Sequence, residues 1–160
     1  MSIFRFIIFL LVLFFAHLLF YQYLSVGEVY PDLFLVLVVY SALRWGSVGG
    51  SVSGFICGMV QDSFSFTYFG LHVLTKTFIG FTIGKMRHSF FSNLYIVQAA
   101  LIFSAKILHD AIFYGVYLFN SPGGFWHQIV FHTIPASLYT CSLGVLLYIP
   151  FNLKTRTKRW

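Results

Sequence analysis

Acidic residues are scarce in this 160-residue sequence, which contains four of them against ten Lys and Arg. Charged residues of either sign make up 9% of the chain, whereas 59% of it is hydrophobic. A soluble domain of this length needs a far more polar surface to stay in solution. The low charge therefore excludes a soluble globular domain and predicts one integral membrane domain over residues 1–160.

Motifs for catalysis and phosphate binding are also lacking. The sequence contains no Gly-x-Ser-x-Gly elbow, no His-Glu-x-x-His pair and no phosphate-binding loop. Ser63 and Ser65 beside Asp62 are better explained as a polar cap at a helix end. Cys57 and Cys141 lie far apart within apolar runs and form no redox or metal pattern. We therefore expect neither an enzyme nor a bound cofactor.

Long apolar runs predict an all-α bundle of six membrane spans, because about 20 residues cross a bilayer as a helix. The alternative is five spans, with Arg44 near the centre of a merged second helix, where insertion scales assign a cost of about 2.5–3.5 kcal/mol. Pro135 is tolerable in the sixth span if a kink or a neighbouring helix satisfies the freed carbonyl. The expected spans are about 3–24, 29–43, 45–62, 68–84, 91–119 and 125–151, with a basic tail at 152–160.

The placement of the basic residues predicts the orientation of these spans. Cytoplasmic connections are enriched in Lys and Arg, and with six spans the basic residues outside the spans all fall on one side. Both termini are therefore expected in the cytoplasm. No basic helical face exists, so we expect contact with the bilayer surface and not with nucleic acid. The residues that set this orientation are Arg5, Arg44, Lys85, Arg87, Lys154, Arg156, Lys158 and Arg159.

Four glycines recur at steps of four through the third predicted span. They are Gly46, Gly50, Gly54 and Gly58, and they share one i, i+4 register. Small residues at this spacing allow another helix backbone to approach closely. This glycine ladder predicts a packing interface, either with a partner protein or inside the chain, and packing against the second and fourth spans is favoured.

Ionisable residues also lie inside the predicted spans, where they are costly unless they face protein or water. Lys106, His109 and Asp110 fall at i, i+3 and i+4 and so share one face of the fifth span. A Lys106–Asp110 ion pair that orients this span is the favoured interpretation, and a proton relay or solute site is the alternative. His72 and Lys76 form a further i, i+4 pair in the fourth span.

Asp62 closes the third predicted span and is placed at the outer membrane surface. There it is expected to reach Lys76 or solvent, and the sequence leaves open whether these two side chains meet. His17 stands alone in the first span, and a lone histidine there is more often a packing residue than a ligand. No two histidines and a carboxylate fall at metal-ligand spacing on one helix, so no metal is expected.

An ordered series of short elements runs through residues 31–84. It consists of Pro31-Asp32-Leu33, Leu43-Arg44-Trp45-Gly46, Gly50, Gly54-Phe55, Gly58, Gln61-Asp62, Phe69-Gly70-Leu71-His72, Lys76 and Gly80. No single element is a strong motif, but the series in this order is similar to the MreD family of rod shape-determining membrane proteins. About a third of the chain carries the resemblance, and the chain length and basic tail agree with it.

The resemblance implies a non-enzymatic scaffold of the bacterial cell-elongation complex in the cytoplasmic membrane. It implies direct binding to the bitopic protein MreC, and coupling of MreB filaments to peptidoglycan synthesis by RodA and a class B penicillin-binding protein. It also implies a six-helix fold similar to the substrate-binding subunits of energy-coupling-factor vitamin transporters. Such a transporter subunit is the alternative function, but these usually carry an Ala-x-x-x-Ala docking surface, whereas Ala16 stands alone in the first span.

Overall fold

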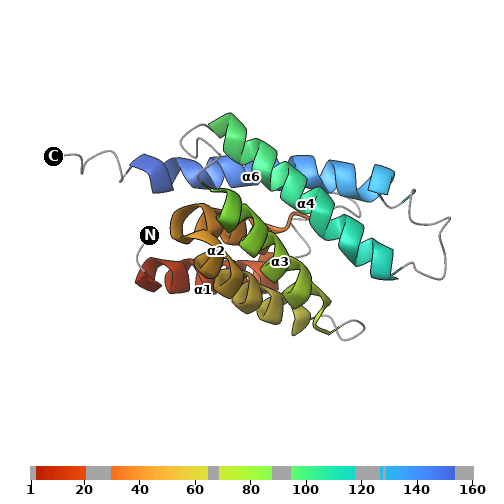
Figure 1. Ribbon diagram of the computed structural model, residues 1–160, viewed down its shortest axis with the longest axis horizontal. Coiled ribbons are helices and arrows are strands. Elements are labelled where there is room, and N and C mark those ends of the chain that lie inside the picture. Colours follow the sequence, from red (N-terminus) through yellow and green to blue (C-terminus); the bar gives the residue numbers. More distant parts are fainter. Residues whose placement is uncertain are drawn as a thin grey trace.

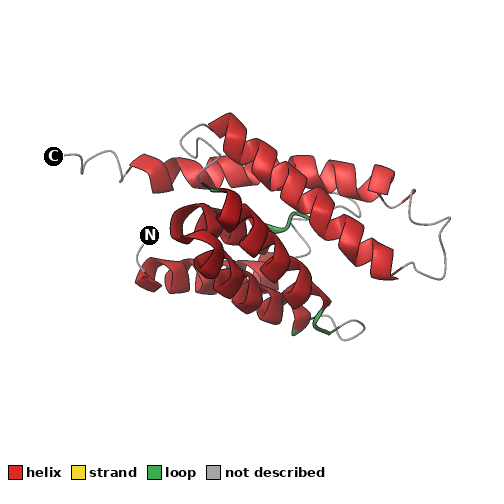
Figure 2. Cartoon of the chain, in the orientation of Figure 1, coloured by secondary structure: helices red, strands yellow, loops and turns green. Residues whose placement is uncertain are grey.

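The described part of the chain is helical apart from short turns, and no strand occurs in it (Figure 2). The computed structural model describes residues 3–20, 30–64, 69–87, 95–117, 127 and 129–153. Its elements are α1 (Ile3–Phe20), α2 (Leu33–Asp62), α3 (Leu71–Met86), α4 (Tyr95–Tyr117), the π-helical turn η1 (Ile129–Thr133) and α6 (Ile134–Leu153). The predicted all-α fold class is thereby confirmed for these residues.

Three stretches within these helices are long and apolar enough to cross a membrane: Leu33–Asp62, Ile96–Val116 and Ile129–Leu146. Five α-helices are counted in the described residues. The prediction of six spans is therefore not confirmed and stays a prediction. α2 and α3 begin a few residues later than expected, because Asp32 and Gly70 occupy their N-cap positions.

The second helix, α2, folds back on itself at Gly46, whose φ of 78° and ψ of −163° lie outside the helical region. An ideal Cβ on Gly50 would lie 2.8 Å from the Cβ of Ala42, although eight residues of continuous helix would place them about 12 Å apart. Figure 1 shows the two halves of α2 running side by side. We refer to them as the first half (33–45) and the second half (47–62).

The turn lies two residues beyond residue 44, which separates the predicted spans 29–43 and 45–62. Arg44 and Trp45 are both helical, and the chain reverses at Gly46 instead. Its backbone angles are strained for a residue with a Cβ, whereas glycine adopts them readily. Arg44 is consequently exposed at one end of the bundle, and not in the middle of a helix.

The helices lie in two groups (Figure 1). The halves of α2 pack extensively against α3, α4 packs against α6, and α3 contacts α4. Among the described elements α1 contacts only α2. The main apolar core joins α2, α3 and α4 through Leu35, Val39, Ile79, Leu101 and Ile102.

The last helix begins with a widened turn. η1 leads directly into α6, and Pro135 is the second residue of α6. Proline has no N–H to donate and its ring crowds the preceding turn, so a regular α-helical turn is disfavoured there. A π-helical turn accommodates the proline without ending the helix, which agrees with the expectation that Pro135 is tolerated in this segment.

Candidate functional site

The glycine ladder of α2 packs against the backbone of α3 inside the chain. An ideal Cβ on Gly50 would lie 2.7 Å from the carbonyl carbon of Gly80, and one on Gly54 would lie 2.6 Å from that of Lys76. Gly58 faces the first turn of α3 equally closely. Real Cβ atoms essentially never come within 3.0 Å of such atoms, so any side chain here would push the two helices apart.

Two glycines of α3 complete this interface. Gly80 faces Gly50 and Gly84 faces Gly46, and an ideal Cβ on either α3 residue would overlap the backbone opposite it. The facing pairs follow each other in antiparallel order along the two helices. Gly80 and Gly84 were not among the residues predicted for this interface, although their own i, i+4 spacing is the same signal as that of the ladder.

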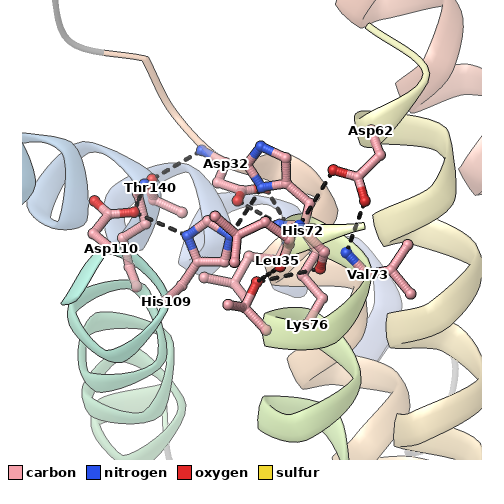
Figure 3. Close-up of polar contacts among 12 residues, drawn as sticks. Asp32, Leu35, Asp62, His72, Val73, Lys76, His109, Asp110 and Thr140 are labelled. Atoms are coloured by element: carbon pink, nitrogen blue, oxygen red, sulfur yellow. Dashed lines mark hydrogen bonds and ion pairs between the residues drawn. The ribbon is translucent and has the colours of Figure 1, made fainter. Parts of the chain in front are cut away.

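A buried polar network lies at the end of the bundle away from Gly46, between α2, α3, α4 and α6 (Figure 3). All three aspartates of the chain are buried in it. Two of them face a lysine, and the third faces the start of a helix. Its ionisable members are Asp32, Asp62, His72, Lys76, Lys106, His109 and Asp110.

Asp32 and Lys76 form a fully buried ion pair between the start of α2 and the second turn of α3. The Oδ2 atom of Asp32 accepts from the Lys76 ammonium, and its Oδ1 atom accepts the N–H of Leu35 at 2.9 Å. The Asp32 N–H donates to the Thr140 hydroxyl of α6 at 3.1 Å. Asp32 therefore ties three helices together.

Sequence reasoning did not single out Asp32 as a site residue. Asp32 entered only as part of the Pro31-Asp32-Leu33 element of the family resemblance. Its position after Pro31 and before an apolar run is that of a helix N-cap, and two intramembrane lysines require two acidic partners in a chain that has four acidic residues. These two signals together could have identified it.

A hydrogen-bonded chain connects α4 to α3. Lys106 Nζ lies 2.6 Å from Asp110 Oδ1, which is also 2.9 Å from His109 Nδ1. The other nitrogen of His109, Nε2, lies 3.2 Å from His72 Nδ1. The two imidazoles are stacked, with centroids 5.3 Å apart, and Phe113 stacks on His72. The structure therefore brings together all three polar residues predicted to share one face, and adds His72 from the neighbouring helix.

Asp62 caps the first turn of α3. Its carboxylate accepts the N–H groups of Gly70 at 3.0 Å, His72 at 3.2 Å and Val73 at 3.1 Å. The first N–H groups of a helix have no partner within it and carry the positive end of its dipole, so they bind a carboxylate well. The expectation that Asp62 reaches Lys76 or solvent is wrong, because Asp62 is fully buried and Lys76 is held by Asp32.

The basic residues predicted to set the orientation are only partly described. Arg44, Lys85 and Arg87 lie at the end of the bundle that contains Gly46, and Nη1 of Arg87 donates to the Arg44 carbonyl at 3.4 Å. The tail residues Lys154, Arg156, Lys158 and Arg159 lie outside the described residues, as do the side chains of Arg5 and His17.

The described residues of this network do not form a metal-binding group. No three His, Cys, Asp or Glu side chains in the described ranges gather in a way that could hold a metal ion. Instead, each of the two buried lysines, Lys76 and Lys106, is paired with a carboxylate. Pairing offsets part of the cost of placing charges in a low-dielectric interior, and loss of either partner would leave an unpaired buried charge. The network can therefore hold helices together and fix their relative rotation.

These features define a class of protein: an α-helical membrane bundle whose polar side chains pair with one another in the interior. The chain belongs to the MreD family, since the family model for the rod shape-determining protein MreD matches residues 1–157. The resemblance seen in residues 31–84 is thereby confirmed over essentially the whole chain. Neither the curated proteins nor the solved structures gave a match. The family and the apolar helices indicate an integral protein of the inner membrane with a role in rod shape determination.

Proposed function

We propose that this protein is a non-enzymatic scaffold of the cell-elongation complex that binds MreC. Through that complex it would help couple MreB filaments to peptidoglycan synthesis by RodA and a class B penicillin-binding protein. The observation that carries the proposal is the family match over residues 1–157. The pairing of the interior charges supports it, because a bundle fixed by such pairs is suited to holding partners in place.

The first helix offers a surface for a partner's single membrane helix. Phe4, Leu11 and Phe15 are exposed along one side of α1, together with Ile7, Ile8 and Val12. Since α1 contacts only α2 among the described elements, this apolar side is open. Helices associate in a membrane through side-chain packing, for which bulky and rigid aromatic residues provide contact area.

Co-purification tests the proposal directly. MreC co-expressed with this chain is expected to remain bound through mild detergent extraction. The double variant Leu11→Ala/Phe15→Ala should retain less MreC, whereas Ile96→Ala/Val116→Ala, which truncates two exposed apolar side chains of α4, should retain as much as the unchanged protein. Failure of the unchanged protein to associate, together with specific binding of a vitamin, would favour the alternative of a transporter subunit.

The proposed orientation places both termini in the cytoplasm. The position of Arg44, Lys85 and Arg87 at one end of the bundle supports it, because basic residues accumulate on the cytoplasmic side. A reporter that is active only in the cytoplasm should be active when fused to the C-terminus. Activity of a periplasmic reporter at the same position would contradict this orientation.

A further inference from the structure

A groove lies on the exposed side of α2 and α3, and Phe81 at one end of it is close in sequence to Gly84, which faces Gly46. Its volume is about 680 Å³, and its walls come from the second half of α2, from α3 and from Ile112 of α4. Phe55, Phe78 and Phe81 provide much of its lining. The glycine contact explains its shape, because the backbones of α2 and α3 meet closely while the large side chains beside them project outward.

The groove ends near an exposed cation. Leu74, Phe78, Phe81 and Lys85 are all exposed, and their spacing places them on one face of α3. Leu74, Phe78 and Phe81 line the groove, and Lys85 follows about 6 Å further along the helix axis. An apolar channel thus leads toward a positive charge.

Further cations gather at the same end. Arg87 donates to the Arg44 carbonyl, and its guanidinium group lies over Gly46. The three aspartates are buried in the polar network at the other end, so this end holds Arg44, Lys85 and Arg87 with no acidic side chain from the described residues. Among the described residues this end of the bundle therefore carries positive charge, which attracts anions.

We propose that this surface binds an anionic phospholipid, with an acyl chain in the groove and the phosphate at Lys85 and Arg87. The dimensions fit. From Lys85 to Leu74, the most distant exposed groove residue on the same face of α3, the helix rises about 16 Å. Half the hydrocarbon core of a bilayer is about 15 Å. An acidic protein segment would use the cations but would leave the apolar groove empty, so the lipid accounts for both features.

Native mass spectrometry of the full chain in detergent micelles tests this binding. Dioleoylphosphatidylglycerol should bind more tightly than dioleoylphosphatidylcholine, which has the same acyl chains but no net charge. The variant Lys85→Gln should weaken phosphatidylglycerol binding about fivefold, the loss expected for one cation near a phosphate-rich surface. Lys85→Gln/Arg87→Gln should weaken it further and leave phosphatidylcholine binding unchanged.

Two further measurements separate the parts of the site. Phe78→Ser, at an exposed position of the groove wall, should weaken binding of both lipids alike. The control Lys154→Gln/Lys158→Gln removes the same charge as the Lys85/Arg87 variant from the basic tail, and should keep the preference for phosphatidylglycerol.

The proposal would be overturned if the two lipids bound equally to the unchanged protein. Equal losses in the tail control and in the Lys85/Arg87 variant would also overturn it, since binding would then follow total charge. Displacement of phosphatidylglycerol by millimolar inorganic phosphate would identify a free-phosphate site instead. Lys85 is exposed, so the single variant keeps the test valid even if the double variant does not fold.

Discussion

The carboxylate of Asp32 serves two helices at once, because one of its oxygens caps the start of α2 and the other binds the ammonium group of Lys76 in α3. Residues 44 positions apart in the chain are thereby fixed against each other in the interior. Since Thr140 of α6 accepts the Asp32 N–H, this contact also sets where α6 lies relative to the α2–α3 pair.

Replacing Lys76 with methionine is expected to destabilise the protein strongly. The change leaves the buried Asp32 carboxylate without its counter-charge, and loss of one partner of a buried ion pair costs about 3–5 kcal/mol. The free energy of unfolding in mixed micelles measures the effect. Asp32→Asn/Lys76→Met should recover much of the loss, because the asparagine oxygen can still cap α2 and no charge is left unpaired. A double variant as unstable as the sum of the singles would contradict the pairing.

Gly54→Leu is expected to prevent the close packing of α2 on α3. Even the first carbon of the new side chain would overlap the α3 backbone at Lys76 and Thr77, and overpacking typically costs about 1–3 kcal/mol or more. Yield and monodispersity after detergent extraction report the loss. Gly115→Ala is the matched control, since nothing lies within 4 Å of its ideal Cβ. It should be neutral or stabilising by up to about 1 kcal/mol. A well-folded Gly54→Leu protein would be incompatible with the packing described.

Asp62→Ala should loosen the first turn of α3. Three backbone N–H groups lose their acceptor, and loss of a helix N-cap costs about 0.5–2 kcal/mol. Hydrogen exchange at residues 70–73 should accelerate, while exchange in α6 stays unchanged. Asp62→Asn should have a smaller effect because it keeps one acceptor oxygen. Ser63→Ala, next in sequence but exposed, serves as the control, and equal acceleration by this variant would argue against the cap.

The contacts of His109 and His72 predict their tautomers. Asp110, ionised beside Lys106, accepts from Nδ1–H of His109. Nε2 of neutral His109 is then an acceptor, so His72 must donate from its own Nδ1. Nitrogen-15 NMR of the labelled protein should show a protonated Nδ1 and a bare Nε2 in both rings. Signals of an imidazolium in either ring would contradict this arrangement. In the Asp110→Asn variant, the preference of His109 for the tautomer protonated at Nδ1 should weaken.

Much of the helical arrangement could be predicted from the sequence. Each helix that the structure describes lies in an apolar run for which the sequence predicts a helix. The glycine spacing predicts the close approach of another helix. The polar face of α4 follows from residue spacing alone, since Lys106, His109 and Asp110 lie on one side of any α-helix. These predictions hold because they rest on the periodicity of one helix, which is local.

Predictions about pairs of helices were less successful. The sequence placed Asp62 within reach of Lys76 or solvent and left open whether these two side chains meet. Asp62 instead meets the start of α3, and Lys76 meets Asp32. Each carboxylate binds the donors that the antiparallel packing of α2 and α3 brings within reach, and a difference of one helical turn in register is enough to change its partner.

The sequence by itself determined that this chain is an apolar helical membrane protein of the MreD family, with glycines on one side of a helix and charges inside its spans. Only the tertiary structure decided that the glycine ladder faces α3, that the chain reverses at Gly46, and which charges pair. Hydrophobicity and spacing act within a single helix, whereas ion pairs and backbone contacts depend on distances between helices. Those distances are fixed only when all the helices pack together.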